Sequence, residues 1–263
     1  MKSSRGYHWK KFWKRGVSLK IIGVIPARYK SSRFPGKPLT DICGKPMIYW
    51  VYQQAKKVPE FDKVYVATDD ERIKAACETW SMDVIMTSDR HQTGSDRVAE
   101  VAEKIEGDLF VNVQGDEPVI NPEMIRQVIS IFTEDDSVYF GSLKKEITDP
   151  QEISAPSTVK VVTDDNGDAM YFSRSVIPSN LKDGRLARVF RHVGIYAYKK
   201  EFLLKFAAME QTELELGEGI EPLRAMQKGY KMRLKETEYT SIGVDLPEHI
   251  EQVEKVIRGE REL

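Results

Sequence analysis

Cysteine and histidine are scarce in this sequence. Its 263 residues include two cysteines, Cys43 and Cys77, which lie far apart and outside any CxxC pair. This spacing argues against a disulfide framework and against a thiolate metal site, and it is typical of a protein of the reducing cytoplasm. The four histidines are equally scattered and form no HExxH-like motif.

A charge excess of either sign is also missing. The chain has 40 Lys and Arg residues against 41 Asp and Glu residues, and its formal net charge is −1. Because a dedicated nucleic-acid binder presents a strong basic field, no nucleic-acid partner is expected. No apolar run approaches the roughly 20 residues that cross a bilayer, so no stable membrane insertion is expected.

The first segment, residues 1–19, is basic and aromatic, and it lacks the apolar core of a secretory signal. Trp9, Phe12 and Trp13 stand beside lysines and could rest on an anionic membrane surface. The favoured interpretation is an extension outside the folded core. We therefore expect a single domain over residues 20–263.

Short strand-like runs alternate with helical patterns from residue 20 onward. Strands are predicted in KIIGVIPA, DKVYVATDD, MDVIMTS and GDLFVNVQGDEP, each followed by a helical pattern. The fourth helix, NPEMIRQVISIFTE, is expected to begin with Asn121 as its cap and Pro122 at its first position. Four consecutive β–α units predict an α/β fold with a mostly parallel, doubly wound sheet.

The second half of the chain has a different pattern. Two strand-like stretches flank Asp165, Asn166 and Gly167, which is a hairpin signal. A further strand is predicted in RVFRHVGIYAYKK, helices in EFLLKFAAM and IEPLRAMQKGY, a strand in YKMRLKETE and a last helix in LPEHIEQVEKVIRG. This order predicts a smaller inserted β-rich subdomain at about residues 150–215, followed by a return to the main sheet.

The loop after the first strand, PARYKSSRFPGK, carries Arg28, Lys30, Arg33 and Lys37 and no acidic residue. It matches neither G-x-G-x-x-G nor the P-loop motif, which disfavours a Rossmann dinucleotide site or a P-loop. Two interpretations remain open for the loop alone. It is either a solvated basic turn or a cradle for a polyphosphate, which backbone N–H groups, Arg and Lys would neutralise.

Acidic residues follow two other predicted strands. Ligands of doubly wound sheets bind beyond the carboxyl ends of the strands, where Asp116 of NVQGDEP and Asp245 of GVDLPEH are expected. Each is either part of a solvated turn or an oxygen ligand of Mg²⁺. His192 and Arg174 are similarly ambiguous, since a strand histidine is often structural and Arg174 is either a surface residue or a partner for a substrate carboxylate.

Taken together, the segments resemble the 3-deoxy-manno-octulosonate cytidylyltransferases, also called CMP-Kdo synthetases. The resemblance runs from Ile21 to about Val256 and is carried by PARYKSSRFPGKPL, VATDDERI, TGSDRVAEV, VNVQGDEP, AMYFSRSVIP, RHVGIYAY and GVDLPEHIEQVE. It implies a glycosyltransferase-A-like nucleotidyltransferase fold. It also implies that CTP and the acidic sugar Kdo react with Mg²⁺ to give CMP-Kdo and pyrophosphate for lipopolysaccharide or capsule. Members are typically cytoplasmic homodimers.

The resemblance also implies roles for individual residues. Catalysis would rest on Arg28, Lys37, Asp116 and Asp245, of which Asp116 and Asp245 would be the magnesium ligands. The nucleotide would be bound by Pro26, Ala27, Arg28, Ser31, Ser32, Arg33, Lys37, Ser95 and Arg97, with Ser95 at the base and Arg33 and Lys37 at the triphosphate. The 3-deoxy ulosonic acid would be bound by Gln114, Arg174, His192, Tyr196 and Glu221.

One segment departs from the family pattern. Members usually have LEQLR where this chain has IEPLR, so Pro222 replaces a glutamine and any hydrogen bond from that side chain is lost. The departure leaves open whether the sugar is Kdo, amino-Kdo or a sialic-acid-like relative. A non-catalytic sugar-nucleotide-binding protein at the membrane surface is the alternative from another functional class.

Overall fold

The fold centres on a mixed β-sheet in a computed structural model that describes residues 19–30, 34–179 and 187–261. Seven strands form the main path in the order β11-β7-β10-β6-β1-β4-β5. Their bounds are β1 (Ile21–Ala27), β4 (Lys63–Thr68), β5 (Val84–Met86), β6 (Leu109–Asn112), β7 (Phe140–Ile147), β10 (Val189–Lys199) and β11 (Arg233–Glu236). β10 runs antiparallel to both neighbours, whereas the other pairs on this path are parallel. The predicted mostly parallel α/β sheet is confirmed.

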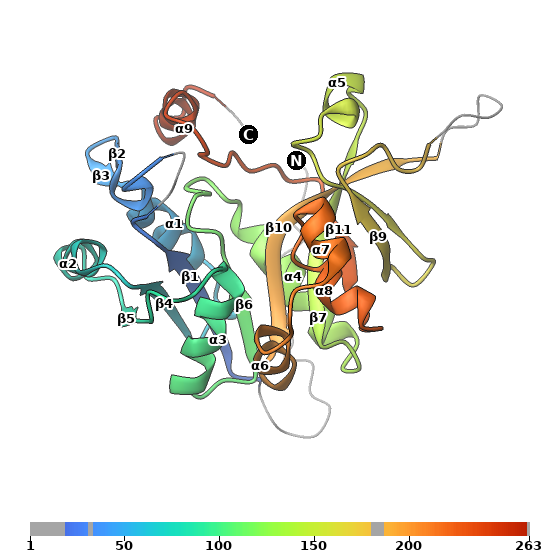
Figure 1. The fold of residues 1–263 in the computed structure, drawn as a ribbon. Helices are drawn as coiled ribbons and strands as arrows, with labels where there is room; N and C mark the ends of the chain where they lie inside the picture. The colour runs from blue at the N-terminus through green and yellow to red at the C-terminus, as the bar shows by residue number, and fades with distance from the viewer. Residues whose placement is uncertain (1–18, 31–33, 180–186, 262–263) are drawn as a thin grey trace, which may run out of the picture.

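Helices cover both faces of the sheet (Figure 1). Side chains of β1 alternate between two cores, because successive residues of a strand point to opposite faces. Ile25 packs in the core with α1 (Met47–Lys56), α2 (Glu71–Thr79) and α4 (Pro122–Glu134). Val24 packs in the core with α3 (Gly94–Lys104) and α6 (Lys200–Ala207). The sheet is therefore doubly wound.

Local capping chemistry sets where the helices begin. Asn121 is the N-cap of α4, where its side chain accepts a hydrogen bond from the Glu123 N–H at 2.9 Å and Pro122 occupies the first turn, as predicted. At α3, Thr93 and Asp96 form a reciprocal capping box. Gly94, the first residue of α3, lies next to Pro26 of β1 and Asn112 of β6.

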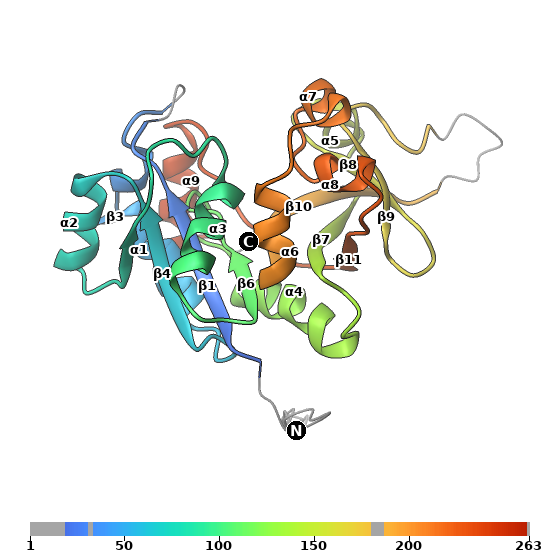
Figure 2. The ribbon, with the colours of Figure 1, turned by 60° about the horizontal axis from the view of Figure 1, so that its bottom comes forward.

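The inserted β-rich segment is a hairpin of β8 (Lys160–Thr163) and β9 (Ala169–Ser173). Gly167 closes its turn at φ +81°, and its N–H bonds to the Asp164 carbonyl at 3.0 Å, as the Asp-Asn-Gly signal predicts. β8 pairs with β10, which carries the chain back into the main sheet. Figure 2 shows this hairpin beside α5 (Pro150–Ser154), away from β4 and β5. A sugar-binding or dimerising role for residues 150–215 stays a prediction.

Several elements were not predicted from the sequence. The largest is β7, which lies between β10 and β11 in the sheet. Shorter ones are η1 (Lys37–Leu39), β2 (Asp41–Ile42), β3 (Lys45–Pro46), α5 and α7 (Glu213–Glu218). The predicted helices near the C-terminus are present as α8 (Leu223–Gln227) and α9 (His249–Ile257). In the described ranges, no helix has the length and apolar character needed to span a bilayer.

Strand order creates a crevice beside β1. β4 and β5 follow on one side of β1, whereas β6 lies on its other side. At such a switch point the connections leave the sheet in opposite directions, which opens space beyond the carboxyl ends of the two central strands. Those ends are Ala27 in β1 and Asn112 in β6.

Candidate active site

A cleft of about 340 Å³ lies at this switch point. The loops after β1, β5 and β6 supply most of its walls, and two segments from the C-terminal third of the chain complete it. Its lining residues are Pro26, Ala27, Arg28, Lys37, Pro38, His91, Gln92, Thr93, Gly94, Arg97, Gln114, Gly115, Asp116, Glu221 and Asp245. Segments far apart in sequence therefore form one polar site.

Lys37 lies at the centre of the charged part of the cleft. Its Nζ donates to Asp116 Oδ2 at 2.7 Å and to the Val244 carbonyl at 2.8 Å, and it lies 3.7 Å from Asp245 Oδ1. The Val244 N–H donates to the Asp116 carbonyl at 2.8 Å, which joins the two acidic segments through the backbone. The structure thus brings the two predicted acids to the same cation.

This arrangement suits a magnesium ion. Two carboxylates and a carbonyl surround one positive charge, and all three provide the hard oxygen atoms that Mg²⁺ prefers. Among the described residues, no group of three or more His, Cys, Asp or Glu side chains could hold a metal. Because Mg²⁺ usually takes one or two carboxylates and completes its shell with water and phosphate, two acids are enough for a substrate-assisted site.

The sequence analysis did not single out Glu117, which follows Asp116 directly. Burial, reinforced by the negative charge of Asp116, raises the pKa of the Glu117 carboxyl to about 7. A substantial fraction of this carboxyl is therefore protonated at neutral pH. Its position in the QGDEP segment was the available signal. Of these two adjacent acids, Asp116 lines the cleft and Glu117 is not among the lining residues, a distinction that sequence alone does not give.

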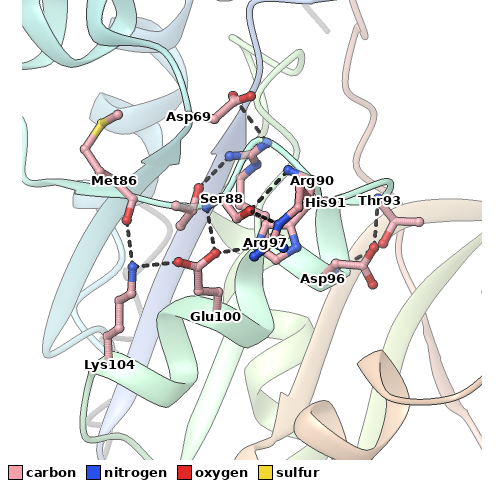
Figure 3. A network of polar contacts seen from close by, with 11 residues as sticks. Asp69, Met86, Ser88, Arg90, His91, Thr93, Asp96, Arg97, Glu100 and Lys104 are labelled. Carbon is pink, nitrogen blue, oxygen red and sulfur yellow. Dashed lines mark hydrogen bonds and ion pairs between the residues drawn. The ribbon is translucent and has the colours of Figure 1, made fainter.

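The wall formed by residues 87–97 contains a buried polar network (Figure 3). Arg97 is only 4% exposed, and its guanidinium donates to Thr87 Oγ1 at 2.5 Å and lies 3.3 Å from Asp69 Oδ1. Burial lowers the pKa of Arg97. Ser95 is also buried, with its hydroxyl 3.1 Å from the Tyr198 hydroxyl, and it does not line the cleft. Its predicted contact with the base stays a prediction.

His91 and Thr93 also line this wall, and the sequence analysis did not select them. Both belong to the polar segment TSDRHQTGSDR, which follows a predicted strand. Their proximity to the cleft depends on the path of that irregular segment between β5 and α3. Its position after a predicted strand therefore indicated that the segment TSDRHQTGSDR would lie near a ligand site, but it did not indicate which of its residues would line the cleft.

Glu221 reaches the cleft from the connection between α7 and α8. Thr93 Oγ1 donates to Glu221 Oε1 at 3.4 Å, and burial raises the pKa of this carboxyl to about 7. A buried ion pair holds the two flanking helices together, with Arg224 Nε and Nη2 2.9 Å and 2.6 Å from the Glu215 carboxylate oxygens. This ion pair fixes the position of the short segment between α7 and α8 that carries Glu221.

Three predicted sugar-binding residues are outside the cleft lining. The Arg174 guanidinium donates to the backbone carbonyls of Glu218, Pro156 and Gly219. Burial lowers the pKa of His192 to about 4, so its ring is neutral at pH 7, and Nε2 lies 3.2 Å from Ser142 Oγ. Burial raises the pKa of Tyr196. These contacts correspond to the structural interpretations of Arg174 and His192, and their roles at a sugar stay predictions.

The remaining predicted residues divide into two groups. Pro26, Ala27, Arg28 and Gln114 line the cleft, and Gln114 Nε2 donates to Asn112 Oδ1 at 3.4 Å. Ser31, Ser32 and Arg33 lie outside the described residues, as does nearly all of the basic segment 1–19.

Comparison with known proteins supports a single family. A family model described as cytidylyltransferase matches residues 22–238. The 3-deoxy-manno-octulosonate cytidylyltransferase of Geobacter metallireducens is 48% identical over 252 residues, covering 91% of this chain and 99% of the relative. The enzyme of the same name from Fusobacterium nucleatum is 46% identical, with coverage of 91% and 98%.

Solved structures agree with this assignment. A CMP:2-keto-3-deoxy-manno-octonic acid synthetase complexed with CTP superposes with a TM-score of 0.87 at 41% identity, over 92% of this chain and 100% of that one. A cytidylyltransferase from Leptospira borgpetersenii, at 15% identity and a TM-score of 0.63, shares the fold. The chain is thus a nucleotidyltransferase that belongs to the 3-deoxy-manno-octulosonate cytidylyltransferase family.

Proposed function

We propose that the protein transfers the cytidylyl group of CTP to Kdo, giving CMP-Kdo and pyrophosphate. The observation that carries the proposal is the meeting of Lys37, Asp116 and Asp245 in the switch-point cleft of a chain of this family. In the reaction, the anomeric hydroxyl oxygen of the sugar bonds to the α-phosphorus. The bond from that phosphorus to the bridging oxygen breaks, pyrophosphate leaves with the electron pair, and the hydroxyl proton passes to solvent.

The cations of the cleft act on the triphosphate. Negative charge accumulates on the phosphate oxygens as pyrophosphate leaves, and fixed positive groups stabilise that charge. Lys37 is oriented by Asp116 and the Val244 carbonyl, so its ammonium is positioned before the nucleotide binds. Arg28 lies at the end of β1 and is exposed, which leaves its guanidinium available for a bidentate phosphate contact.

Asp116 and Asp245 are the residues that would hold Mg²⁺. The chemistry supplied by such an ion is polarisation of the phosphate oxygens and a lower pKa for the attacking hydroxyl. With an ion held by these two carboxylates, the Lys37 ammonium would be available to donate to a phosphate oxygen.

Gln114 and Glu221 are polar side chains of the cleft that are available to the sugar. With a pKa near 7, the Glu221 carboxyl either donates or accepts a hydrogen bond at neutral pH. Pro222, the first residue after Glu221, is the N-cap of α8 and makes no side-chain capping bond there. Because this proline replaces a polar residue of the family pattern, amino-Kdo and a sialic-acid-like sugar are the alternative substrates.

The wider role is proposed on the family resemblance. The product would donate Kdo for lipopolysaccharide or capsule, and the enzyme would act in the cytoplasm as a homodimer. The alternative from another class is a non-catalytic sugar-nucleotide-binding protein at the membrane surface. Lys37, Asp116 and Asp245 in one cleft speak against it, because a passive binder needs no converging acids beside the phosphates.

A substrate panel tests the function. Purified protein with CTP, MgCl₂ and Kdo is expected to release pyrophosphate, and EDTA is expected to stop the release until excess MgCl₂ is added. Amino-Kdo and sialic acid in place of Kdo identify the sugar, and UTP, ATP and GTP in place of CTP identify the nucleotide. If no ulosonic acid releases pyrophosphate with any nucleotide, the proposed function is wrong.

Arg28→Ala is expected to weaken CTP binding by about tenfold, which is the effect of losing one charge-assisted contact worth roughly 1.5 kcal/mol. Equilibrium titration of CTP onto the protein measures the change. Lys30→Ala is the matched control, because Lys30 is an exposed cation of the same loop that does not line the cleft. If Arg28→Ala and Lys30→Ala lose equal CTP affinity, the loss reflects the overall positive charge of the loop, and a specific contact of Arg28 with CTP is contradicted.

A further inference from the structure

The segment of residues 87–93 forms one side wall of the cleft and belongs to no helix or strand. Its two ends are held by the Thr87 N–H, which donates to the Thr68 carbonyl at 2.8 Å, and by the capping box of Thr93. It contributes His91, Gln92 and Thr93 to the lining. Between these ends the segment needs side-chain contacts to hold one conformation, because no regular backbone ladder orders it there. Its anchors therefore bear directly on how well the cleft is preorganised.

Glu100 on α3 anchors the interior of this segment (Figure 3). Its carboxylate accepts hydrogen bonds from the Ser88 N–H at 2.8 Å, from Lys104 Nζ at 2.6 Å and from the His91 ring at Nε2. Lys104 Nζ also donates to the Met86 carbonyl at 2.8 Å. Glu100 thus joins Ser88 and His91 to α3, and Lys104 of the same helix joins the end of β5 to it.

The carboxylate keeps its charge in this position. Burial alone would raise the pKa of Glu100, but the hydrogen bonds from Lys104, Ser88 and His91 outweigh burial and lower the pKa to about 2. Hydrogen bonds to an ionised acceptor are stronger than those between neutral groups. Glu100 therefore holds its three donors as a carboxylate throughout the neutral pH range.

Glu100 itself is outside the cleft lining, whereas His91 is part of it. With Nε2 directed to Glu100, the imidazole is fixed in the wall and Nδ1 is the ring nitrogen not bonded to this carboxylate. The charged centre at Lys37, Asp116 and Asp245 is built from other segments, after β1, after β6 and before α9. The anchor and the reacting phosphates are thus carried by different parts of the fold.

We propose that Glu100 is a positioning residue for the nucleotide, acting through His91 and the 87–93 segment without touching CTP. The inference rests on the proposed function for the identity of the nucleotide. Without the carboxylate, residues 88–91 would have to be ordered when CTP binds, and that cost would reduce the affinity for CTP. The chemical step would be preserved, because the groups that act on the phosphates keep their own anchors.

The test compares Glu100→Ala with Glu103→Ala. Glu103 is an exposed acid of the same helix, and its replacement controls for helix charge and propensity. Glu100→Ala is expected to raise the Kd and KM for CTP about tenfold, with kcat and the KM for the sugar within about twofold of the parent. Glu103→Ala is expected to change none of these quantities.

A second comparison tests whether Glu100 acts through His91. His91→Ala is expected to raise the Kd for CTP. In the double variant, which combines Glu100→Ala with His91→Ala, the Kd for CTP is expected to rise by less than the product of the two single-variant fold-increases. Glu100→Gln keeps the shape and one acceptor oxygen, so a smaller shift in the same direction is expected even if the alanine variant folds poorly. A fall in kcat with an unchanged Kd for CTP, or fully multiplicative effects, would overturn the proposal.

Direct CTP binding separates this inference from the proposed function. If the parent protein binds CTP but turns over no ulosonic acid, the proposed function fails and the Kd comparison still decides the role of Glu100. If turnover is normal and Glu100→Ala and Glu100→Gln both leave the Kd for CTP unchanged, the inference about Glu100 fails by itself.

Discussion

Asp116→Asn is expected to lower kcat by at least about 10³-fold while leaving the fold intact. The substitution preserves the size of the side chain but removes its negative charge, which both orients Lys37 at 2.7 Å and would hold the metal ion. The Asp116 side chain is 34% exposed, so the neutral amide can be solvated and unfolding is not expected. Pyrophosphate release under saturating CTP and sugar measures the effect.

Asp83→Asn is the matched control for this change. Asp83 is an exposed acid whose carboxylate lies 3.9 Å from Lys63 and outside the cleft. It should retain near-parental turnover, and both variants should give the same circular dichroism spectrum as the parent. Turnover within tenfold of the parent for Asp116→Asn would remove Asp116 from the catalytic centre and, with it, the proposed metal site.

Arg224→Met is expected to destabilise the protein by roughly 3–5 kcal/mol. Arg224 and Glu215 form a two-point ion pair whose side chains are only 4% and 5% exposed. Removal of the arginine leaves a buried carboxylate without its counter-charge, and that desolvation cost is far larger than the loss of a surface pair. Urea unfolding followed by tryptophan fluorescence gives the free energy of unfolding.

Two further variants identify the cause of this loss. Replacement of both partners, as Glu215→Leu with Arg224→Met, is expected to recover much of the stability, because no buried charge is then left unpaired. Arg258→Met removes an exposed arginine that pairs with Glu254 and should leave the unfolding midpoint nearly unchanged. If the double variant has the same free energy of unfolding as Arg224→Met, the packing of the two side chains, and not their charges, is what the pair contributes to stability.

Elements with local signals were predictable from the sequence. The helix of α4 has its cap, its proline and its apolar spacing within one short stretch, and the β8–β9 turn is specified by Asp165, Asn166 and Gly167. Each of these features involves hydrogen bonds or φ angles within a few residues. No distant part of the chain is needed to interpret them.

β7 lacked such a signal. Its sequence, FGSLKKEI, contains a glycine, a serine and three consecutive charged residues, which is unusual for a strand inside a sheet. In the fold, Lys144 donates to Thr163, Lys145 to the Glu238 carbonyl, and Glu146 pairs with Arg188. The partners that make this strand acceptable come from other strands and loops, so only their assembly reveals it.

The order of the β–α units, the Asn121 cap of α4 and the polar character of the strand ends followed from the sequence by itself, because each depends on neighbouring residues. The tertiary structure alone decided that Asp116 and Asp245 meet at Lys37, since strand order and the Val244–Asp116 backbone bond place them there. It also decided that Glu100 anchors His91. These contacts join segments that are distant in sequence, so they can form and stabilise the protein only after the whole sheet has brought those segments together.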